Sequence, residues 1–129
     1  MILYINTTQN NLIEIGVKVK NKFIVKKKFS SRRTQAEKLL PGIAKLLKVN
    51  RLKLSDLKEI KVANQGGSFT SLRIGVVTAN ALAYSLGRPV TGEFGRVKMV
   101  NQGQRSFNVV EPLYSSQPAI IKKKSLFRA

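Results

Sequence analysis

The sequence predicts an α/β domain in which a mixed five-stranded sheet carries two main helices on one face. Two observations predict this class. Three strand-like runs joined by short turns precede the first helical segment, which is typical of antiparallel pairing. A second helical segment separates two further strands, and a helix is the usual connection between parallel strands. The 129 residues, 43% of them hydrophobic, are enough for one hydrophobic core and predict a single domain.

The first 30 residues predict three consecutive antiparallel strands. Residues 2–5 are apolar and end in a polar turn. In residues 12–19 every second side chain is aliphatic, which is typical of a strand with one buried face. Asn21 lies in a tight turn, and residues 22–29 form a third run rich in β-forming side chains.

The first helix is predicted over residues 34–49. Thr34 and Glu37 have the spacing of a capping box, in which each side chain satisfies a free backbone amide. Pro41 lacks an amide hydrogen and Gly42 follows it, so we expect a kink or a short break there. Apolar side chains recur at helical spacing along one stripe, at Ala36, Leu39, Leu40, Ile43, Leu46 and Leu47.

The second helix is predicted over residues 70–86. A strand at 59–64 and a glycine pair precede it, and Ser68 or Thr70 can cap its first turn. Gly87 ends the helical pattern. Apolar side chains cover most of the helix, which predicts burial on more than one side.

One side of this second helix carries small residues. Gly75, Ala79 and Ala83 recur every four positions and leave a flat surface. A flat surface allows another helix to approach closely. Ordinary core packing and a partner interface explain the pattern equally well, and both stay open.

Residues 88–92 correspond to a fifth strand in the pattern of the family that the chain resembles, as described below, and the helix before it implies that this strand lies parallel to the strand at 59–64. Residues 93–108 are rich in glycine, glutamine and arginine, and we expect a short bridge without regular structure there. Residues 122–129 form a basic tail.

Positive charge is the strongest signal in the composition. Twenty-four lysines and arginines against six acidic residues give a formal net charge of +18. Nucleic acid is the usual polyanionic partner of such a chain, and a general bias toward solubility is the alternative. The charge is spread along the chain, which favours a basic face on a folded domain over a detachable tail.

The sequence lacks the residues from which many catalytic and metal sites are built. It contains no cysteine and no histidine, so it offers neither a thiolate ligand nor an imidazole base. A cysteine-free chain fits a reducing cytoplasm, which is the expected location. We expect no metal, no cofactor and no acid–base catalysis, because no two of the six carboxylates are closely spaced: Glu14, Glu37, Asp56, Glu59, Glu93 and Glu111.

Two short segments are candidate anion sites. Lys26, Lys27, Lys28, Arg32 and Arg33 crowd the end of the third strand, where they suit phosphate contact, protection of a sheet edge or simple solvation.

The strand–turn–helix unit at Gly66, Gly67 and Ser68 has the geometry of many phosphate sites. It lacks the lysine of a P-loop, so a simple tight turn is the favoured interpretation.

The segment QGGSFTSLRIGVVTANALAYSLGRPV resembles the signature of the TsaB (YeaZ) family, whose members are subunits of the bacterial machinery that makes threonylcarbamoyladenosine in tRNA. It departs from the family pattern at Gln65, Gly66 and Ser71. The matching residues are Gly67, Ser68, Phe69, Thr70, Leu72, Arg73, Ile74 and Gly75.

Two further segments support the resemblance, which covers residues 1–92 and 109–121. The first helix matches the family at Arg33, Leu39, Leu40, Pro41, Ile43, Leu46 and Leu47. The segment after residue 108 resembles the family's closing segment at Val110, Pro112, Tyr114, Pro118 and Ile120. The resemblance implies an actin-like ATPase (RNase H-like) lobe over residues 1–121, with the family's second lobe shortened to the bridge at 93–108.

The resemblance also bears on nucleotide binding. In actin-like folds the first hairpin carries an aspartate that faces the phosphates and metal, and Asn6, followed by Thr7, occupies that position here. A neutral amide is a poorer ligand for a hard cation than a carboxylate. We favour a turn cap at Asn6 and keep Asn6, Thr7, Gly66, Gly67 and Ser68 as the candidate phosphate turn.

The function implied by the resemblance is that of a non-catalytic subunit. The family's helix pair packs against the equivalent pair of the paralogous subunit TsaD, which implies a TsaD-like partner here, with a homodimer as the alternative for the chain alone. The expected interface residues are Leu39, Ile43, Leu72, Gly75, Val76, Ala79 and Ala83. The candidates for tRNA or partner contact are Lys26, Lys27, Lys28, Arg32, Arg33 and Arg73.

Two other function classes remain open at this point. The net charge also suits a stand-alone basic RNA-binding domain, although aromatic residues are only 7% of the chain and form no stacking platform. An actin-like nucleotide-binding protein is the second alternative, against which Asn6 argues.

Overall fold

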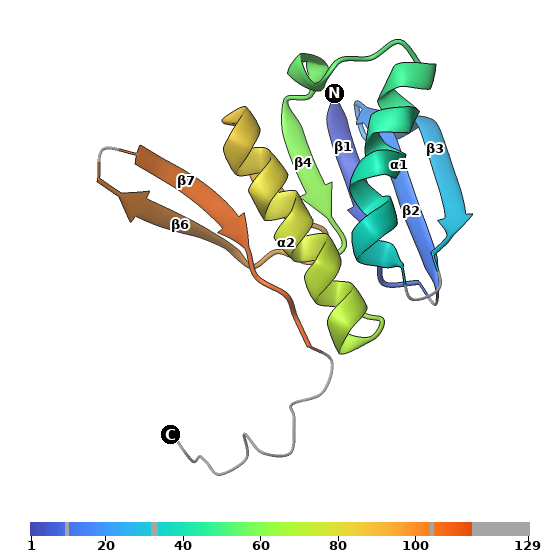
Figure 1. Ribbon diagram of the computed structural model, residues 1–129. Helices are drawn as coiled ribbons and strands as arrows, with labels where there is room; N and C mark the ends of the chain where they lie inside the picture. The colour runs from blue at the N-terminus through green and yellow to red at the C-terminus, as the bar shows by residue number, and fades with distance from the viewer. Residues whose placement is uncertain (10, 32–33, 104, 115–129) are drawn as a thin grey trace.

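The computed structural model describes residues 1–9, 11–31, 34–103 and 105–114 (Figure 1). Arg32, Arg33, residues 115–121 of the predicted lobe and the predicted basic tail at 122–129 lie outside this range. The elements in chain order are β1 (Ile2–Asn6), β2 (Leu12–Val19), β3 (Lys22–Ser30), α1 (Gln35–Val49), a 3-10 turn (Leu54–Asp56), β4 (Glu59–Val62), α2 (Phe69–Leu86), β5 (Val90–Gly92), β6 (Val97–Gln102) and β7 (Arg105–Val110).

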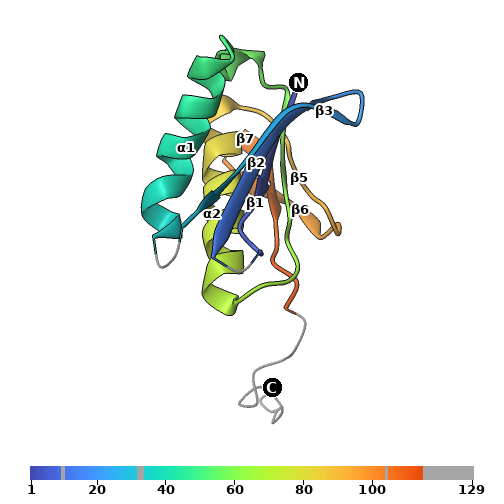
Figure 2. The same ribbon diagram turned by 90° about the vertical axis from the view of Figure 1, so that its right-hand side faces the viewer.

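The main sheet has the strand order β3-β2-β1-β4-β5. β1 pairs antiparallel with β2, and β2 pairs antiparallel with β3, which confirms the predicted meander. β4 lies parallel to β1 on one side and to β5 on the other. Figure 2 shows α1 and α2 on the same face of this sheet, so the predicted fold class is confirmed.

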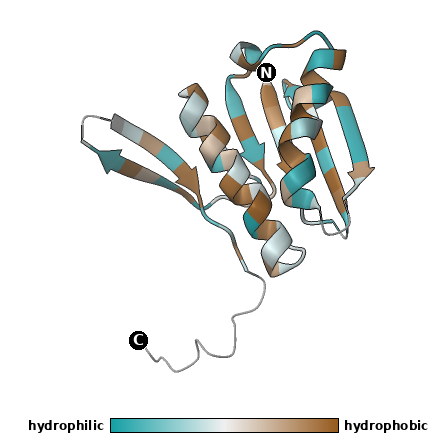
Figure 3. Ribbon diagram, in the orientation of Figure 1, coloured by the Kyte–Doolittle hydropathy of each residue, from teal (hydrophilic) through white to brown (hydrophobic). Residues whose placement is uncertain are grey.

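The hydrophobic core lies between the sheet and the two helices. Alternate side chains of β1 and β2, among them Leu3, Ile5 and Ile15, are fully buried there. Figure 3 shows hydrophobic residues along these central strands and on stripes of both helices. Burial of such aliphatic side chains, about 1.5–3 kcal/mol each, is the main force that fixes the helices on the sheet.

The ends of α2 follow from its sequence. The Ser68 hydroxyl accepts a hydrogen bond from the Ser71 amide at 3.0 Å and so caps the first turn, as predicted. Gly87 ends the helix in the left-handed conformation, with φ of 65°, which glycine adopts without a steric penalty.

α1 lacks the predicted capping hydrogen bond of Thr34 and the short break that was one of two expectations at Pro41. Thr34 is the N-cap residue, but its side chain makes no capping hydrogen bond because its backbone (φ −131°, ψ 23°) is outside the extended geometry of a cap. Pro41 does not break α1, which is helical from Gln35 to Val49. The residues of α1 that face the sheet, such as Leu39 and Leu46, hold the helix across the proline.

The bridge at 93–108 is not the irregular loop that was expected, because most of it forms the hairpin β6–β7. The strands pair antiparallel from Val97 opposite Val110 to Gln102 opposite Arg105. The hairpin extends beside α2 on the side away from β3 (Figure 1). Most side chains of β6 are exposed, so the segment lacks the apolar alternation that marks a strand in a sequence.

Candidate functional site

The carboxyl ends of the parallel strands β1, β4 and β5 meet at one edge of the sheet, which is where α/β folds usually bind ligands. The chain segments that follow these strands carry the residues predicted as a phosphate turn. Gly66 and Gly67, after β4, lie against Thr8, after β1. The structure therefore brings the predicted residues together, and their hydrogen bonds decide what the site can do.

Asn6 uses both ends of its side chain within the turn. Its Oδ1 accepts from the Thr8 amide at 2.8 Å and from the Thr8 hydroxyl at 2.5 Å. Its Nδ2 donates to the Tyr4 hydroxyl at 3.3 Å. This is the turn cap favoured from the sequence. Its two hydrogen bonds already use the Asn6 Oδ1 atom, which would have to coordinate a cation.

Thr7 connects three elements of the fold. Its hydroxyl donates to the Ser71 carbonyl oxygen of α2 at 2.5 Å, and its own carbonyl oxygen accepts from Gln35 Nε2 of α1 at 3.2 Å. Gly75 allows this contact, because a Cβ atom there would overlap the Thr7 hydroxyl. Thr7 is fully buried and therefore holds the two helices against the end of β1.

The glycine pair forms a tight turn. Gly66 and Gly67 have φ of 101° and 74°, which side-chain-bearing residues rarely adopt. A Cβ atom on Gly67 would lie 2.5 Å from the Thr8 carbonyl oxygen. Ser68 already caps α2, so the glycines explain the turn without a ligand, and a phosphate role for this turn stays a prediction.

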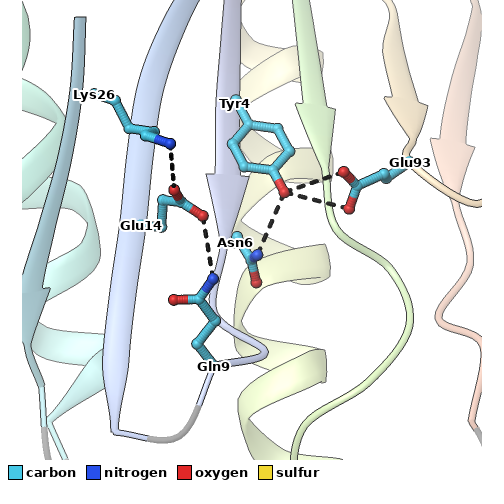
Figure 4. A network of polar contacts seen from close by, with 6 residues as sticks. All are labelled: Tyr4, Asn6, Gln9, Glu14, Lys26 and Glu93. Atoms are coloured by element: carbon cyan, nitrogen blue, oxygen red, sulfur yellow. Dashed lines mark hydrogen bonds and ion pairs between the residues drawn. The ribbon is translucent and has the colours of Figure 1, made fainter. Parts of the chain in front are cut away.

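A polar network lies on the face of the sheet opposite the helices (Figure 4). The Tyr4 hydroxyl donates to the Glu93 carboxylate, whose two oxygens lie 3.2 and 3.3 Å away. Glu14 accepts from Gln9 Nε2 at 3.3 Å and forms an ion pair with Lys26 at 3.4 Å. These contacts occupy two carboxylates in structural interactions.

Burial raises the pKa of the Tyr4 phenol above its ordinary value, and the neighbouring Glu93 charge raises it further. The phenol is therefore a protonated hydrogen-bond donor near neutral pH and does not serve as a base. Sequence reasoning missed this network because Tyr4 and Glu93 are 89 positions apart and neither lies in a recognisable motif.

The seven residues predicted for a partner interface are all buried within this chain, where they pack in its own core. The small-residue side of α2 faces its own sheet: Ala79 is 0% exposed and Ala83 is 1% exposed. This is the core-packing alternative that the sequence left open. The buried set is Leu39, Ile43, Leu72, Gly75, Val76, Ala79 and Ala83.

The outer side of the helix pair carries exposed apolar residues instead. Leu40 of α1 is 53% exposed, and Val77 of α2 is 62% exposed. Two hollows of about 350 and 490 Å³ lie along the helices on this side. We call this surface the α1–α2 groove; its lining residues include Leu40, Ala44, Leu54, Ile74, Val77 and Leu82.

The four basic residues predicted for contact that the structure describes do not form one patch. Lys26, Lys27 and Lys28 are exposed on β3. Arg73 is exposed on α2, where its guanidinium lies 5.6 Å from the centre of the Phe69 ring. α1 lies between β3 and α2 (Figure 1), so a single ligand must be large to contact both groups.

Two negative findings hold for the described part of the chain. No group of three or more acidic, histidine or cysteine side chains is placed to hold a metal ion within the described ranges. None of the helices described is long and apolar enough to cross a membrane.

Residues 26–93 match the family model "TsaD: tRNA N6-adenosine threonylcarbamoyltransferase". The chain is similar to the tRNA threonylcarbamoyladenosine biosynthesis protein TsaB of Bacillus subtilis (strain 168), with 27% identity over 86 residues. That alignment covers 67% of this chain and 38% of the Bacillus protein.

Two solved structures are similar to the fold. YeaZ from Pseudomonas aeruginosa superposes with a TM-score of 0.64 at 25% identity, over 70% of this chain and 42% of that protein. A second structure, of an uncharacterized protein with similarity to peptidase YeaZ from Pseudomonas aeruginosa, gives a TM-score of 0.64 at 25% identity over 70% and 41% of the two chains. The matched region thus spans about two fifths of the length of these relatives.

Proposed function

The chain belongs to the family of the matched TsaD model, among its TsaB (YeaZ) members, and on this premise we propose that it is a non-catalytic subunit that binds a TsaD-like partner through the α1–α2 groove. Membership in this family connects the chain with threonylcarbamoyladenosine synthesis in tRNA. The partner and the absence of catalysis are the proposed part. A role on tRNA would place the chain in the cytoplasm.

The exposure of apolar side chains along the α1–α2 groove carries this proposal. Leu40 of α1 and Val77 of α2 are 53% and 62% exposed, although both helices have a well-packed inner side, and Leu54 of the 3-10 turn is 45% exposed beside them. A contiguous patch of exposed apolar side chains is typical of a protein interface. A helix pair is also the geometry that packs against a second helix pair, as in a four-helix bundle.

The polar side chains support a non-catalytic role. Asn6 stands at the end of β1 where actin-like enzymes carry a metal-binding aspartate, and its side-chain oxygen already accepts two hydrogen bonds. Glu14 and Glu93 are engaged with Lys26 and Tyr4. A scaffold that keeps a catalytic partner competent needs none of these groups to be free.

Gel filtration with light scattering tests the proposal, using the chain mixed with the TsaD-like subunit of the same organism. We expect a 1:1 species with the wild-type chain and its loss in the variant Leu40→Arg/Val77→Arg. The matched control is Val97→Arg/Met99→Arg, which adds the same two charges at residues of β6 that are 46% and 60% exposed. A complex that survives the double variant, or no complex with the wild type, would contradict the proposal.

Direct contact with tRNA is a second candidate function, favoured by the net charge of +18. Lys26, Lys27 and Lys28 on β3 and Arg73 on α2 are the described candidates, and the predicted candidates Arg32 and Arg33 lie outside the described residues. Binding of the isolated chain to tRNA that falls steeply with salt would support this candidate. If the salt-dependent shift appears only with the TsaD-like subunit present, the partner supplies the tRNA site.

A further inference from the structure

A second groove lies on the other side of α1, between this helix and β3. Its volume is about 570 Å³. Gly42 allows the Phe29 ring to lie against the helix, because a Cβ atom there would come within 2.6 Å of that ring. We call this the β3–α1 groove; its apolar floor consists of Val25, Phe29, Pro41, Leu46 and Val49.

One wall of the β3–α1 groove is the outer strand of the sheet. β3 pairs with β2 in regular register from Val25 to Ser30, and it stands last in the strand order. Among the residues that the structure describes, no strand pairs with its outer side. The backbone amides and carbonyls of that side are therefore available to another extended chain.

The rim of the β3–α1 groove is basic. Lys27 projects from β3, and Lys38 and Lys45 project from α1, all of them exposed. Glu37 is the acidic residue of the lining. Lysines at a sheet edge discourage indiscriminate pairing with apolar strands, and the same charges attract a strand that carries carboxylates.

We propose that the β3–α1 groove binds an acidic extended segment of another protein, which adds to β3 as a sixth strand. Successive side chains of a strand point to opposite faces. Every second side chain of the added strand would therefore face α1 and fill the apolar floor beside Val25 and Phe29. Carboxylates on the segment would meet Lys27, Lys38 and Lys45 at the rim.

Charge argues against two other occupants. A second copy of β3 carries Lys22, Lys26, Lys27 and Lys28, so pairing between two copies would bring like charges together. The segment KKKSLFRA at the end of the chain is basic as well.

An RNA strand would match the charge of the groove. Single-stranded RNA needs surfaces on which its bases stack, but the floor of the groove offers aliphatic side chains and one aromatic ring, Phe29.

Fluorescence anisotropy with labelled synthetic peptides tests this inference. The probe is the heptapeptide EVEVEVE, and EEEEVVV is its control of equal composition and charge. A fully N-methylated EVEVEVE keeps the side chains and loses every backbone donor. We expect saturable binding of the first peptide and at least about tenfold weaker binding of the other two, because strand addition depends on alternation and on backbone hydrogen bonds.

Two matched variants of the full chain locate the site. Lys45→Glu changes the rim of the β3–α1 groove, whereas Lys48→Glu makes the same charge change on the other side of α1, at a residue that lines the α1–α2 groove. We expect about tenfold weaker peptide binding with Lys45→Glu and less than a twofold change with Lys48→Glu. Circular dichroism checks that both variants are folded.

Three results would overturn the inference. Equal binding of all three peptides would mean general charge attraction, and no binding of EVEVEVE would mean that the groove takes no strand. Displacement of the peptide by a ten-nucleotide oligouridine at similar concentration would assign the groove to RNA.

Discussion

The side chain of Asn80 exchanges two hydrogen bonds with the backbone of Val110. Its Nδ2 donates to the Val110 carbonyl oxygen at 3.0 Å, and its Oδ1 accepts from the Val110 amide at 2.8 Å. Asn80 lies on α2 and Val110 ends β7, so this pair fastens the hairpin to the helix. A two-stranded hairpin is marginally stable alone, and such contacts are what keep it ordered.

The variant Asn80→Ala should therefore loosen the hairpin. It leaves the Val110 amide and carbonyl without their partner, at a cost of about 1–3 kcal/mol. Hydrogen exchange measured by NMR should become faster at amides of β6 and β7 and stay unchanged in β1 and β2.

Asn101→Ala is the matched control, since Asn101 bonds only within the hairpin, to Ser106 at 2.7 Å among the described contacts. If the control accelerates exchange as much as Asn80→Ala, the contact with α2 is not what orders the hairpin.

Gly75→Ala should destabilise the domain. A methyl group at Gly75 would overlap the Thr7 hydroxyl, which donates to the Ser71 carbonyl oxygen. We expect the free energy of unfolding in urea to fall by about 1–3 kcal/mol, despite the better helix propensity of alanine. In the background Thr7→Ala the same change should cost less, because the overlapping atom is gone. Equal costs in both backgrounds would show that this contact does not require the glycine.

The two sides of α2 should respond oppositely to a new charge. Ala79 is 0% exposed, and Ala79→Arg would bury an unpaired guanidinium in the core. Its cost of several kcal/mol is comparable to the whole stability of a small domain, so we expect an unfolded chain. Val77→Arg, at a 62% exposed residue, should keep the wild-type circular dichroism spectrum and thermal midpoint. A folded Ala79→Arg protein would contradict the assignment of the inner side.

Tyr4 should make stability fall at alkaline pH. Its pKa in the folded protein is raised by burial and by Glu93, so the unfolded chain loses the phenolic proton first. The stabilising contribution is full below the ordinary tyrosine pKa of about 10 and declines as the pH rises above it. The stability difference between wild type and Tyr4→Phe, from urea unfolding at pH 8 and pH 11, should shrink at the higher pH. A constant difference would contradict this account of Tyr4.

The hydrophobic pattern was sufficient to predict the main sheet and both helices. Residues 12–19 alternate cleanly, and apolar residues recur at helical spacing through 70–86, so local sequence and tertiary structure agree on these two elements. The hairpin β6–β7 was not predicted, because side chains such as Met99 are exposed to solvent. Its sequence therefore lacks the alternation of apolar and polar residues that indicates a strand.

The side of the helix pair that faces solvent was harder to predict. Both sides of α2 are apolar, and a single sequence does not say which side covers the chain's own sheet. The small side, with Ala79, packs on the sheet, whereas Val77 on the larger side is exposed. The Tyr4–Glu93 contact joins residues 89 positions apart, so only the folded chain reveals it.

Accessibility of residue 77 tests the proposed interface most directly. The chain has no cysteine, so Val77→Cys and Met99→Cys each introduce a single thiol at an exposed site of α2 or β6. We would measure the rate of maleimide labelling by mass spectrometry, with and without the TsaD-like subunit. The account predicts that the subunit slows labelling at residue 77 at least about tenfold and leaves residue 99 unchanged. Unchanged labelling at residue 77 in a demonstrated complex would contradict docking through the α1–α2 groove.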